Sequence, residues 1–295
     1  MKREKRKKII IVNPAAGSGR KRNKILSELN KQLKNSEIVY DLVETKKPKD
    51  AKKIAEAIDP NIYDTIVAAG GDGTINEVLN GIAGKKITLG ILPIGTVNVL
   101  AKELGIPLQL PKAFNVLKNN NIRIIDLAKA DNHYFALMAG IGFDAYTIFK
   151  VNLGLKKFFG GLAYVFSGIH SFLKYPPKRI FLTLDGNIKE DGFFILVSNS
   201  AFYGGTYKLN PNAKLDDGYL NIAIFKERKT INLFRSMGDV LLFKTPQFSD
   251  VRFYKAKKAY ISSESNVLAH ADAELIGTLP LHFEIVPKFL KVLVP

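Results

Sequence analysis

Residues 8–125 alternate between short apolar runs and segments with apolar residues at helical spacing. Within 20–34, for example, Ile25, Leu29 and Leu33 recur every four residues and would share one face of a helix. Apolar runs that alternate with helices predict a mainly parallel sheet covered by helices on both faces. The expected strands span 8–13, 37–43, 64–69 and 87–92, and the expected helices span 20–34, 50–58 and 74–82.

The pattern changes after about residue 126, where short strand-like stretches dominate. Turn sequences such as Asp185-Gly186 and Asp217-Gly218 separate them. Strands joined in this way predict a mostly antiparallel second domain. The expected strands span 180–184, 193–198, 219–225, 251–254, 258–261 and 281–286.

The chain is strongly basic, with 44 lysines and arginines against 27 aspartates and glutamates, which gives a net charge of +17. Without residues 1–8 it keeps 38 basic and 26 acidic groups, so the excess is spread along the chain. Anionic lipid surfaces, polyphosphate substrates or nucleic acid would each fit this charge, as would a surface that is only solvated. Charge alone does not choose among these partners.

Composition also bears on the compartment. The absence of cysteine excludes disulfides and cysteine-bound zinc and favours the cytoplasm. The apolar run 9–12 is too short for a signal peptide, so we expect no secretion of a globular, soluble protein. The four histidines lack metal-ligand spacing, and we expect them to be structural or on the surface.

The segment 153–175 is rich in phenylalanine and tyrosine. Its stretch without lysine or arginine, 158–173, has 16 residues, fewer than the roughly 20 that a membrane-spanning helix needs. Two interpretations stay open: a helix partly buried in the second domain, or an interfacial surface that approaches lipid.

The strongest local motif is the glycine-rich stretch 69–77, which follows an apolar strand and opens a helix. Adjacent glycines let backbone N–H groups approach phosphate oxygens, and the helix adds its positive N-terminal end. Thr74 could bond a phosphate or cap the helix, and Asp72 could act through magnesium or hold the loop. The alternative is a tight turn with an ordinary cap.

Two further loops follow strands, at 13–20 and 93–98. The first has neither the P-loop pattern nor the third glycine of a dinucleotide fingerprint, so by itself it could be a plain turn. Three loops after three parallel strands would, however, line one edge of the sheet, where open α/β sheets bind ligands. Their convergence predicts a phosphate site.

Near the C-terminus, Asp272 and Glu274 are two residues apart. If the backbone is extended, both carboxylates lie on one side of the strand. One could then accept a hydroxyl proton while the other bonds or assists magnesium. The alternative is two solvent-facing acids on an edge strand, and Asp216-Asp217-Gly218 could likewise be a turn without chemistry.

With these motifs, the chain resembles the diacylglycerol kinase catalytic-domain family, in particular its bacterial soluble lipid kinases. The likeness extends nearly from end to end and keeps its order. The matching motifs are 13–20, 70–77, 93–98, 140–144, 203–205, 210–220 and 272–274.

The resemblance implies a fold and a set of site residues. It implies an α/β nucleotide-binding domain over 1–125, to which 290–295 return, and a β-sandwich lipid domain over 126–289. It implies magnesium at Asp217 with main-chain carbonyls of Lys214 and Tyr219. Glu274 would be the proton acceptor and Asp272 its partner, although the two could trade roles. The residues that would contact ATP are Asn13, Pro14, Ala15, Ala16, Gly17, Thr45, Gly70, Gly71, Asp72, Gly73, Thr74, Ile75, Asn76 and Thr96.

The chain departs from the family's pattern at two positions. Ala273 stands where the family commonly has glycine, so a positive φ there would cost about 1–2 kcal/mol. Val99 follows Asn98 where the family commonly has aspartate, so any role of that acid is absent or met elsewhere. Both departures leave the exact substrate open.

The expected reaction is transfer of the ATP γ-phosphoryl group to diacylglycerol or a related lipid alcohol, giving phosphatidic acid or its analogue. A cytoplasmic enzyme of this kind would bind reversibly to the anionic inner surface of a membrane. NAD kinase and a kinase of sphingoid bases or other lipids remain alternatives, as does a nucleotide-sensing or nucleic-acid-binding protein. The chain shows no nucleic-acid recognition motif, and a homodimer is left open.

Overall fold

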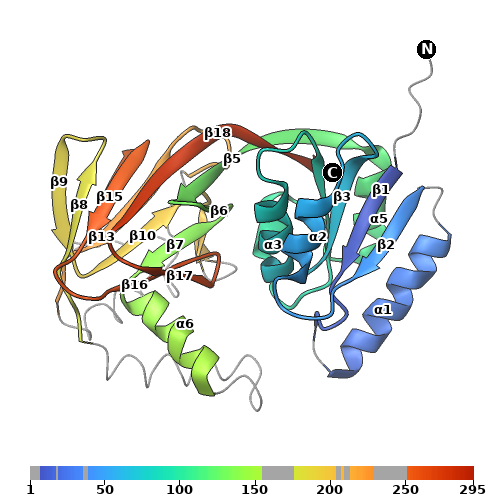
Figure 1. Ribbon diagram of the computed structural model, residues 1–295, viewed down its shortest axis with the longest axis horizontal. Coiled ribbons are helices and arrows are strands. Elements are labelled where there is room, and N and C mark those ends of the chain that lie inside the picture. The colour runs from blue at the N-terminus through green and yellow to red at the C-terminus, as the bar shows by residue number, and fades with distance from the viewer. Residues whose placement is uncertain are drawn as a thin grey trace. The chain divides into compact units, whose positions relative to one another are not determined.

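The computed structural model describes residues 7–17, 19–35, 39–154, 176–203, 207–208, 213–228 and 251–295. The chain divides into two compact units: unit 1 comprises Met1–Asp126 and Pro287–Pro295, and unit 2 comprises Leu127–Val286. The expected boundaries, after residues 125 and 289, differ from these by one and three residues. Two strands, β5 (Asn121–Ala130) and β18 (Leu281–Val294), run from one unit into the other (Figure 1).

Unit 1 is built on parallel strands in the order β2-β1-β3-β4. Residues 65–70 of β3 are all buried, because helices cover both faces of the sheet. The end of β18 adds a further parallel strand, with Lys291 beside Thr88 of β4. The strands are β1 (Lys7–Val12), β2 (Tyr40–Glu44), β3 (Tyr63–Gly70) and β4 (Thr88–Pro93).

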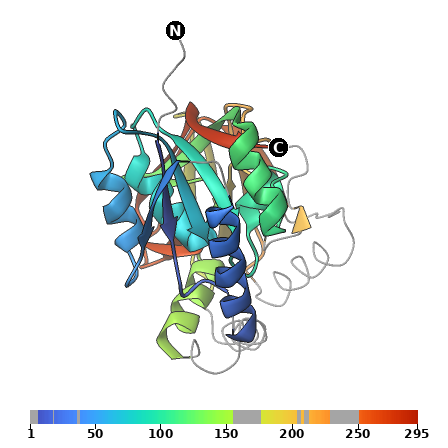
Figure 2. The same cartoon turned by 90° about the vertical axis from the view of Figure 1, so that its right-hand side faces the viewer.

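Helices cover both faces of this sheet, as predicted. The helices α2 and α3 pack together, as do α1 and α5, and Figures 1 and 2 show the two pairs on opposite faces. The helix expected at 74–82 begins two residues earlier, because Asp72 and Gly73 already belong to its first turn. The helices are α1 (Gly19–Lys34), α2 (Asp50–Ala57), α3 (Asp72–Ile82), α4 (Val99–Glu103) and α5 (Leu110–Asn119).

Unit 2 is a sandwich of two mostly antiparallel sheets, as predicted. One sheet has the order β14-β13-β10-β7-β16-β17, and the other runs from β18 through β15 and β8 to β9. The elements are β6 (His133–Phe135), β7 (Met138–Ile141), α6 (Phe143–Gly154), β8 (Ile180–Leu184), β9 (Ile188–Gly192), β10 (Phe194–Ser198), β11 (Phe202–Tyr203), β12 (Tyr207–Lys208), β13 (Leu220–Phe225), β14 (Val251–Ala256), β15 (Lys258–Ser262), β16 (Leu268–Ala271) and β17 (Glu274–Thr278).

An apolar core fills the space between the two sheets. It takes Ile195 and Ile222 from one sheet and Leu182 and Phe283 from the other, all of them buried. Phe283 meets the ring of Phe135 edge to face, with 6.4 Å between centroids. Strand β8 alternates buried and half-buried residues, which is typical of a strand with one face on a core.

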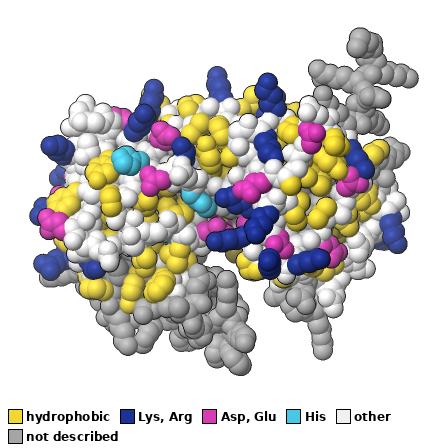
Figure 3. Space-filling model, in the orientation of Figure 1, with side chains coloured by type: hydrophobic (Ala, Val, Ile, Leu, Met, Phe, Trp, Pro, Cys, Tyr) yellow, Lys and Arg dark blue, Asp and Glu magenta, His cyan; other side chains and the backbone are white. Residues whose placement is uncertain are grey.

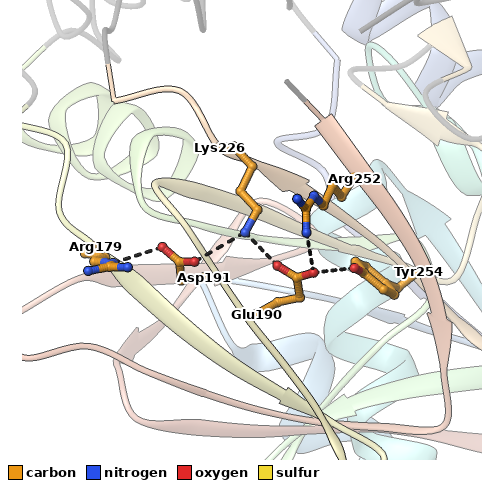
Figure 4. A network of polar contacts seen from close by, with 6 residues as sticks. All are labelled: Arg179, Glu190, Asp191, Lys226, Arg252 and Tyr254. Carbon is orange, nitrogen blue, oxygen red and sulfur yellow. Dashed lines mark hydrogen bonds and ion pairs between the residues drawn. The ribbon is translucent and has the colours of Figure 1, made fainter. Parts of the chain in front are cut away.

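Charged side chains join the edges of the two sheets, as Figure 4 shows. Glu190 on edge strand β9 accepts a hydrogen bond from Lys226 Nζ, just after β13, at 2.6 Å. The same carboxylate accepts one from Arg252 on edge strand β14 at 2.9 Å, and the Tyr254 hydroxyl also donates to it. This network closes one open side of the sandwich.

Some sequence expectations fall outside the described residues. These are Ser18 of the first loop, most of the aromatic segment 153–175, Gly204-Gly205 and the stretch 210–212. Strand β18 is longer than the expected 281–286, since it continues to Val294. In the part of the chain that the structure describes, no helix combines the length and apolar character needed to cross a bilayer.

Candidate active site

The first loop of unit 1 begins at Asn13, where β1 ends. Asn13 Oδ1 accepts a hydrogen bond from Ala15 N (2.9 Å), and Asn13 Nδ2 donates to Thr74 Oγ1 (3.0 Å). The backbone N–H of Asn13 donates to Ala69 O of β3 (2.9 Å). The first loop is therefore tied to the end of β3 and the start of α3. Of the residues expected to contact ATP here, Ala16 is buried and the others are exposed or half-buried: Asn13, Pro14, Ala15 and Gly17.

The glycine-rich loop (69–77) and the third loop (93–98) are in contact through their backbones. Gly70 O accepts hydrogen bonds from Ile94 N (3.1 Å) and Gly95 N (3.2 Å). A Cβ on Gly95 would lie 2.3 Å from Gly71 Cα, so a side chain there would force the loops apart. Asn98 folds the third loop on itself, since its Nδ2 donates to Gly95 O (3.0 Å) and its Oδ1 accepts from Gly95 N (3.1 Å).

Asp72 supports the third loop. Its Oδ1 accepts hydrogen bonds from Val99 N (2.7 Å) and Leu100 N (3.3 Å), the first amides of α4. Burial raises the pKa of the Asp72 carboxyl, and the backbone hydrogen bonds from Leu100 and Val99 oppose the rise. Of the two roles expected for Asp72, magnesium contact or loop support, this geometry favours loop support.

Glu77, at the end of the same motif, holds the loop that follows β2 through hydrogen bonds. Its carboxylate accepts hydrogen bonds from Lys49 N (2.9 Å) and Ala51 N (3.1 Å) at the start of α2. It thereby satisfies N–H groups that the N-cap residue's own side chain leaves unbonded. Thr45 begins this loop, and its N–H donates to Val12 O (2.9 Å). One motif thus joins three neighbouring loops at the carboxyl end of the sheet.

These loops present backbone groups rather than long side chains. Gly73 and Thr96 are exposed, and a Cβ built on Gly73 would have no atom within 4 Å. Thr74, Ile75 and Asn76 are only 6%, 2% and 2% exposed, so their side chains support the loop from inside the unit. Because α3 begins here, its first N–H groups and its positive dipole end also lie at this edge. The edge is therefore suited to an anion such as a phosphate group.

In unit 2 the acid pair lies in a tight hairpin. Asp272 and Ala273 form the two-residue turn between β16 and β17, with Ala271 opposite Glu274. Both turn residues have positive φ, 45° and 66°, as in a type I′ turn. The extended backbone that would put both carboxylates on one side of a strand is therefore absent at this turn, and the period-two alternation does not apply to it.

The Asp272 carboxylate holds this hairpin in place. Its Oδ2 accepts a hydrogen bond from Ala136 N (2.9 Å), and its Oδ1 accepts from Leu137 N (3.0 Å) and Met138 N (3.1 Å). The Asp272 N–H also donates to Met138 O (2.8 Å). Three backbone donors occupy the carboxylate, so Asp272 is placed to position the turn. Glu274 is half-buried and lies at the start of β17, directly after the turn.

A buried polar pair beside the hairpin was not predicted. His270 on β16 is 3% exposed, and its Nε2 lies 2.8 Å from Asp144 Oδ2 in the first turn of α6. Gly140 makes room for the pair, because a Cβ there would lie 2.4 Å from His270 Nε2. The partners are 126 residues apart, so no local spacing in the sequence could reveal them.

The segment expected to bind magnesium forms a turn in unit 2. Gly218 has a φ of 75°, and Asp217 Oδ1 accepts a hydrogen bond from Tyr219 N (3.1 Å). Asp217 Oδ2 pairs with Lys255 Nζ at 2.9 Å, and an ion at Asp217 would have to displace that ammonium group. A magnesium site at Asp217 with the main-chain carbonyls of Lys214 and Tyr219 stays a prediction. Within the described ranges, no three His, Asp or Glu side chains gather as a metal site.

Comparison with known proteins matches each part of the chain to a family model. Residues 7–130 match the diacylglycerol kinase catalytic domain, and residues 138–294 match the YegS C-terminal NAD kinase beta sandwich-like domain. The diacylglycerol kinases of Staphylococcus aureus strains MRSA252 and bovine RF122 / ET3-1 are 32% identical over 291 residues, 97% of this chain and 91% of theirs.

Solved structures agree with this match. The crystal structure of a diacylglycerol kinase from Bacillus anthracis str. Sterne is 25% identical, with a TM-score of 0.74 over 98% of this chain and 97% of that one. A second crystal structure from the same organism is 26% identical, with a TM-score of 0.80 over the same shares. By sequence and by fold, the chain belongs to the diacylglycerol kinase family.

Proposed function

We propose that this chain transfers the γ-phosphoryl group of ATP to a hydroxyl of a lipid alcohol, with diacylglycerol as the first candidate and phosphatidic acid as the product. The observation that carries the proposal is the set of loops at the carboxyl ends of β1, β3 and β4, which one motif joins. Open α/β sheets bind ligands at this edge. The names of the Staphylococcus aureus relatives support diacylglycerol as the acceptor.

The glycine-rich loop and the third loop would hold the phosphates. Gly71, Gly73 and Gly95 have no side chains, so phosphate oxygens can come close to the backbone N–H groups. The exposed Thr96 hydroxyl and the N-terminus of α3 would add further donors. Asp72 and Glu77 would contribute by fixing the loops.

Glu274 would act as the proton acceptor. As the lipid oxygen forms its bond to the γ-phosphorus, its proton would pass to the Glu274 carboxylate and the bond from phosphorus to the ADP oxygen would break. Asp272 would keep the turn in place without taking the proton. Such a reaction depends mainly on positioning and on electrostatic stabilisation of the phosphoryl group.

An apolar cavity in unit 2 supports a lipid substrate. Its volume is about 340 Å³, and its lining includes Tyr146 and Phe149 of α6 with Val267 and Leu268 at the start of β16. A cavity lined in this way would remove part of an acyl chain from water. Such a cavity would contribute little to binding the polar molecule NAD.

The basic surface would bring the enzyme to its substrate. The net charge is +17, and on the face drawn in Figure 3 lysine and arginine side chains lie over both units. Such charge attracts anionic headgroups reversibly and is screened by salt. In liposome flotation we expect binding to vesicles with anionic lipid that is lost in high salt. Equal flotation with neutral vesicles would contradict this part of the proposal.

A substrate panel tests the proposed reaction. The chain is incubated with γ-labelled ATP, magnesium and, separately, diacylglycerol, a sphingoid base and NAD. We expect label in diacylglycerol. Label in the sphingoid base alone would change the lipid, and label in NAD alone would refute a lipid kinase.

A further inference from the structure

Polar contacts hold the hairpin that carries Glu274 at two residues, Asp272 and His270. At the turn, Asp272 accepts hydrogen bonds from the backbone that leads into β7. Two residues earlier, His270 contacts Asp144 at the start of α6, at 2.8 Å. The helix α6 packs on both β16 and β17, so the second contact joins the hairpin to the helix that covers it.

The direction of Glu274 depends on a short stretch of regular pairing. Ala271 faces Glu274 and His270 faces Leu275, but the register of β16 against β17 then shifts. Gly277, beyond the shift, has a φ of 128°. A bulge of this kind redirects the strand on either side of it. His270 therefore belongs to one of only two register pairs between the turn and the bulge.

The contact between His270 and Asp144 gives a defined geometry at a cost in stability. With the Asp144 carboxylate as acceptor, His270 Nε2 is the donor of this contact. Nδ1 is buried and has no hydrogen-bond partner among the described residues, and a buried polar atom without a partner costs free energy. Apolar side chains of similar volume at both positions would avoid this cost.

We propose that His270 and Asp144 form a positioning pair that ties β16 to the first turn of α6 and thereby holds Glu274 in the direction that proton transfer needs. The inference rests on the proposed function for the role of Glu274. Neither residue touches the reacting atoms in this account. Gly140 is part of the arrangement, because a side chain there would displace both partners.

Three variants separate positioning from stability. His270→Leu leaves the Asp144 carboxylate without its partner, so both the melting temperature and kcat should fall. The double variant His270→Leu/Asp144→Leu pairs two apolar groups and should recover most of the melting temperature. Its kcat should stay at least about tenfold below wild type with KM for ATP unchanged, since a displacement of about 1 Å can cost about 100-fold. Asp144→Asn keeps an acceptor for Nε2–H and should retain most of the wild-type kcat.

Tyr254→Phe is the matched control. It removes a half-buried hydrogen bond from Tyr254, on β14 at the opposite edge of the same sheet, to Glu190 on β9. We expect a lower melting temperature and an unchanged kcat. A double variant at His270 and Asp144 with wild-type kcat would overturn the proposal, as would an Asp144→Asn variant as impaired as His270→Leu.

Hydrogen exchange of the amides of residues 272–275 gives a second readout that needs no activity. Exchange there should be faster in the double variant than in wild type, despite the recovered melting temperature. Unchanged exchange would overturn the positioning role. If wild type phosphorylates no lipid, the proposed function fails, and the exchange measurement still decides whether the pair orders the hairpin.

Discussion

At the residue scale, the turn between β16 and β17 depends on two residues in an uncommon conformation. Asp272 and Ala273 have φ values of 45° and 66°, in the left-handed region. Aspartate tolerates this region and alanine does so at a cost, because its Cβ approaches the backbone. The sequence predicted strain at Ala273 if its φ were positive, and its φ is positive in the structure.

Ala273→Gly should therefore raise the free energy of unfolding by about 0.5–1 kcal/mol. Glycine removes the steric cost of the positive φ. It also gives the unfolded chain more conformational entropy, which offsets only part of that gain. Urea denaturation measures the difference. Ala269→Gly, at a fully buried position of β16, should instead lower the free energy of unfolding by about 1 kcal/mol. A destabilised Ala273→Gly variant would mean that the turn is not strained.

At the scale of elements, the carboxyl edge of the parallel sheet is organised by side chains that reach between loops. Thr74 receives a hydrogen bond from Asn13 of the first loop, Glu77 caps α2, and Asp72 caps α4. Where the glycine-rich loop meets the third loop, only backbone separates them. The distance between these loops is therefore sensitive to a single methyl group.

Gly95→Ala should raise KM for ATP at least about tenfold. The added Cβ would lie 2.3 Å from Gly71 Cα and 2.7 Å from Asn98 Oδ1, so the amides that we propose bind phosphate would have to move. Gly84→Ala is the control, since Gly84 has a φ of 80° and no atom within 4 Å of an added Cβ. It should cost about 1 kcal/mol of stability and leave KM for ATP unchanged. Wild-type ATP affinity in Gly95→Ala would remove this contact from the nucleotide site.

The network at the open side of the sandwich makes unit 2 sensitive to acid. Burial raises the pKa of Glu190, but hydrogen bonds from Lys226, Tyr254 and Arg252 outweigh it and lower the pKa from 4.5 to about 2. A carboxyl with a lowered folded-state pKa stabilises the fold above its unfolded-state pKa. That stability is lost as the pH falls from about 4.5 towards 2.

Between pH 7 and pH 3, wild type should lose about 1 kcal/mol more of its free energy of unfolding than Glu190→Gln does. The effect is smaller than the full pKa shift would give, because the Arg252 side chain is 60% exposed and water screens its charge. Urea denaturation at both pH values tests this. Glu56→Gln, which removes an exposed carboxylate 3.8 Å from Lys52, should follow wild type. Equal losses in wild type and Glu190→Gln would contradict the assigned role.

At the scale of the whole molecule, the sequence predicted the two architectures because each leaves a strong pattern. Residues 9–12 and 66–69 are continuous apolar runs, since a parallel sheet buries these strands on both faces. The stretches after residue 126 are short and separated by turns, as in an antiparallel sandwich. The resemblance to the family then matched the motifs, in their order along the chain, to these strands and helices.

What the sequence could not predict depends on partners far apart or on turns without the usual residues. Asp72 and Asp272 bond backbone groups at least 27 and 134 positions away, so no spacing rule reveals their roles. The turn 272–273 lacks glycine, so the usual sequence signal of a two-residue turn with positive φ is missing there. Strand β18 continues beyond the expected end at 286, although Pro287 lacks an N–H group and Lys288 has a φ of 52°.

The central claim is that nucleotide binding belongs to the loops of unit 1 and proton acceptance to Glu274 of unit 2. Its most direct test is the transfer of label from γ-labelled ATP to diacylglycerol by wild type and by Glu274→Gln, each at saturating ATP. The account predicts labelled lipid from wild type and a rate at least about 100-fold lower from Glu274→Gln, with ATP affinity unchanged. Equal rates from the two proteins would contradict it.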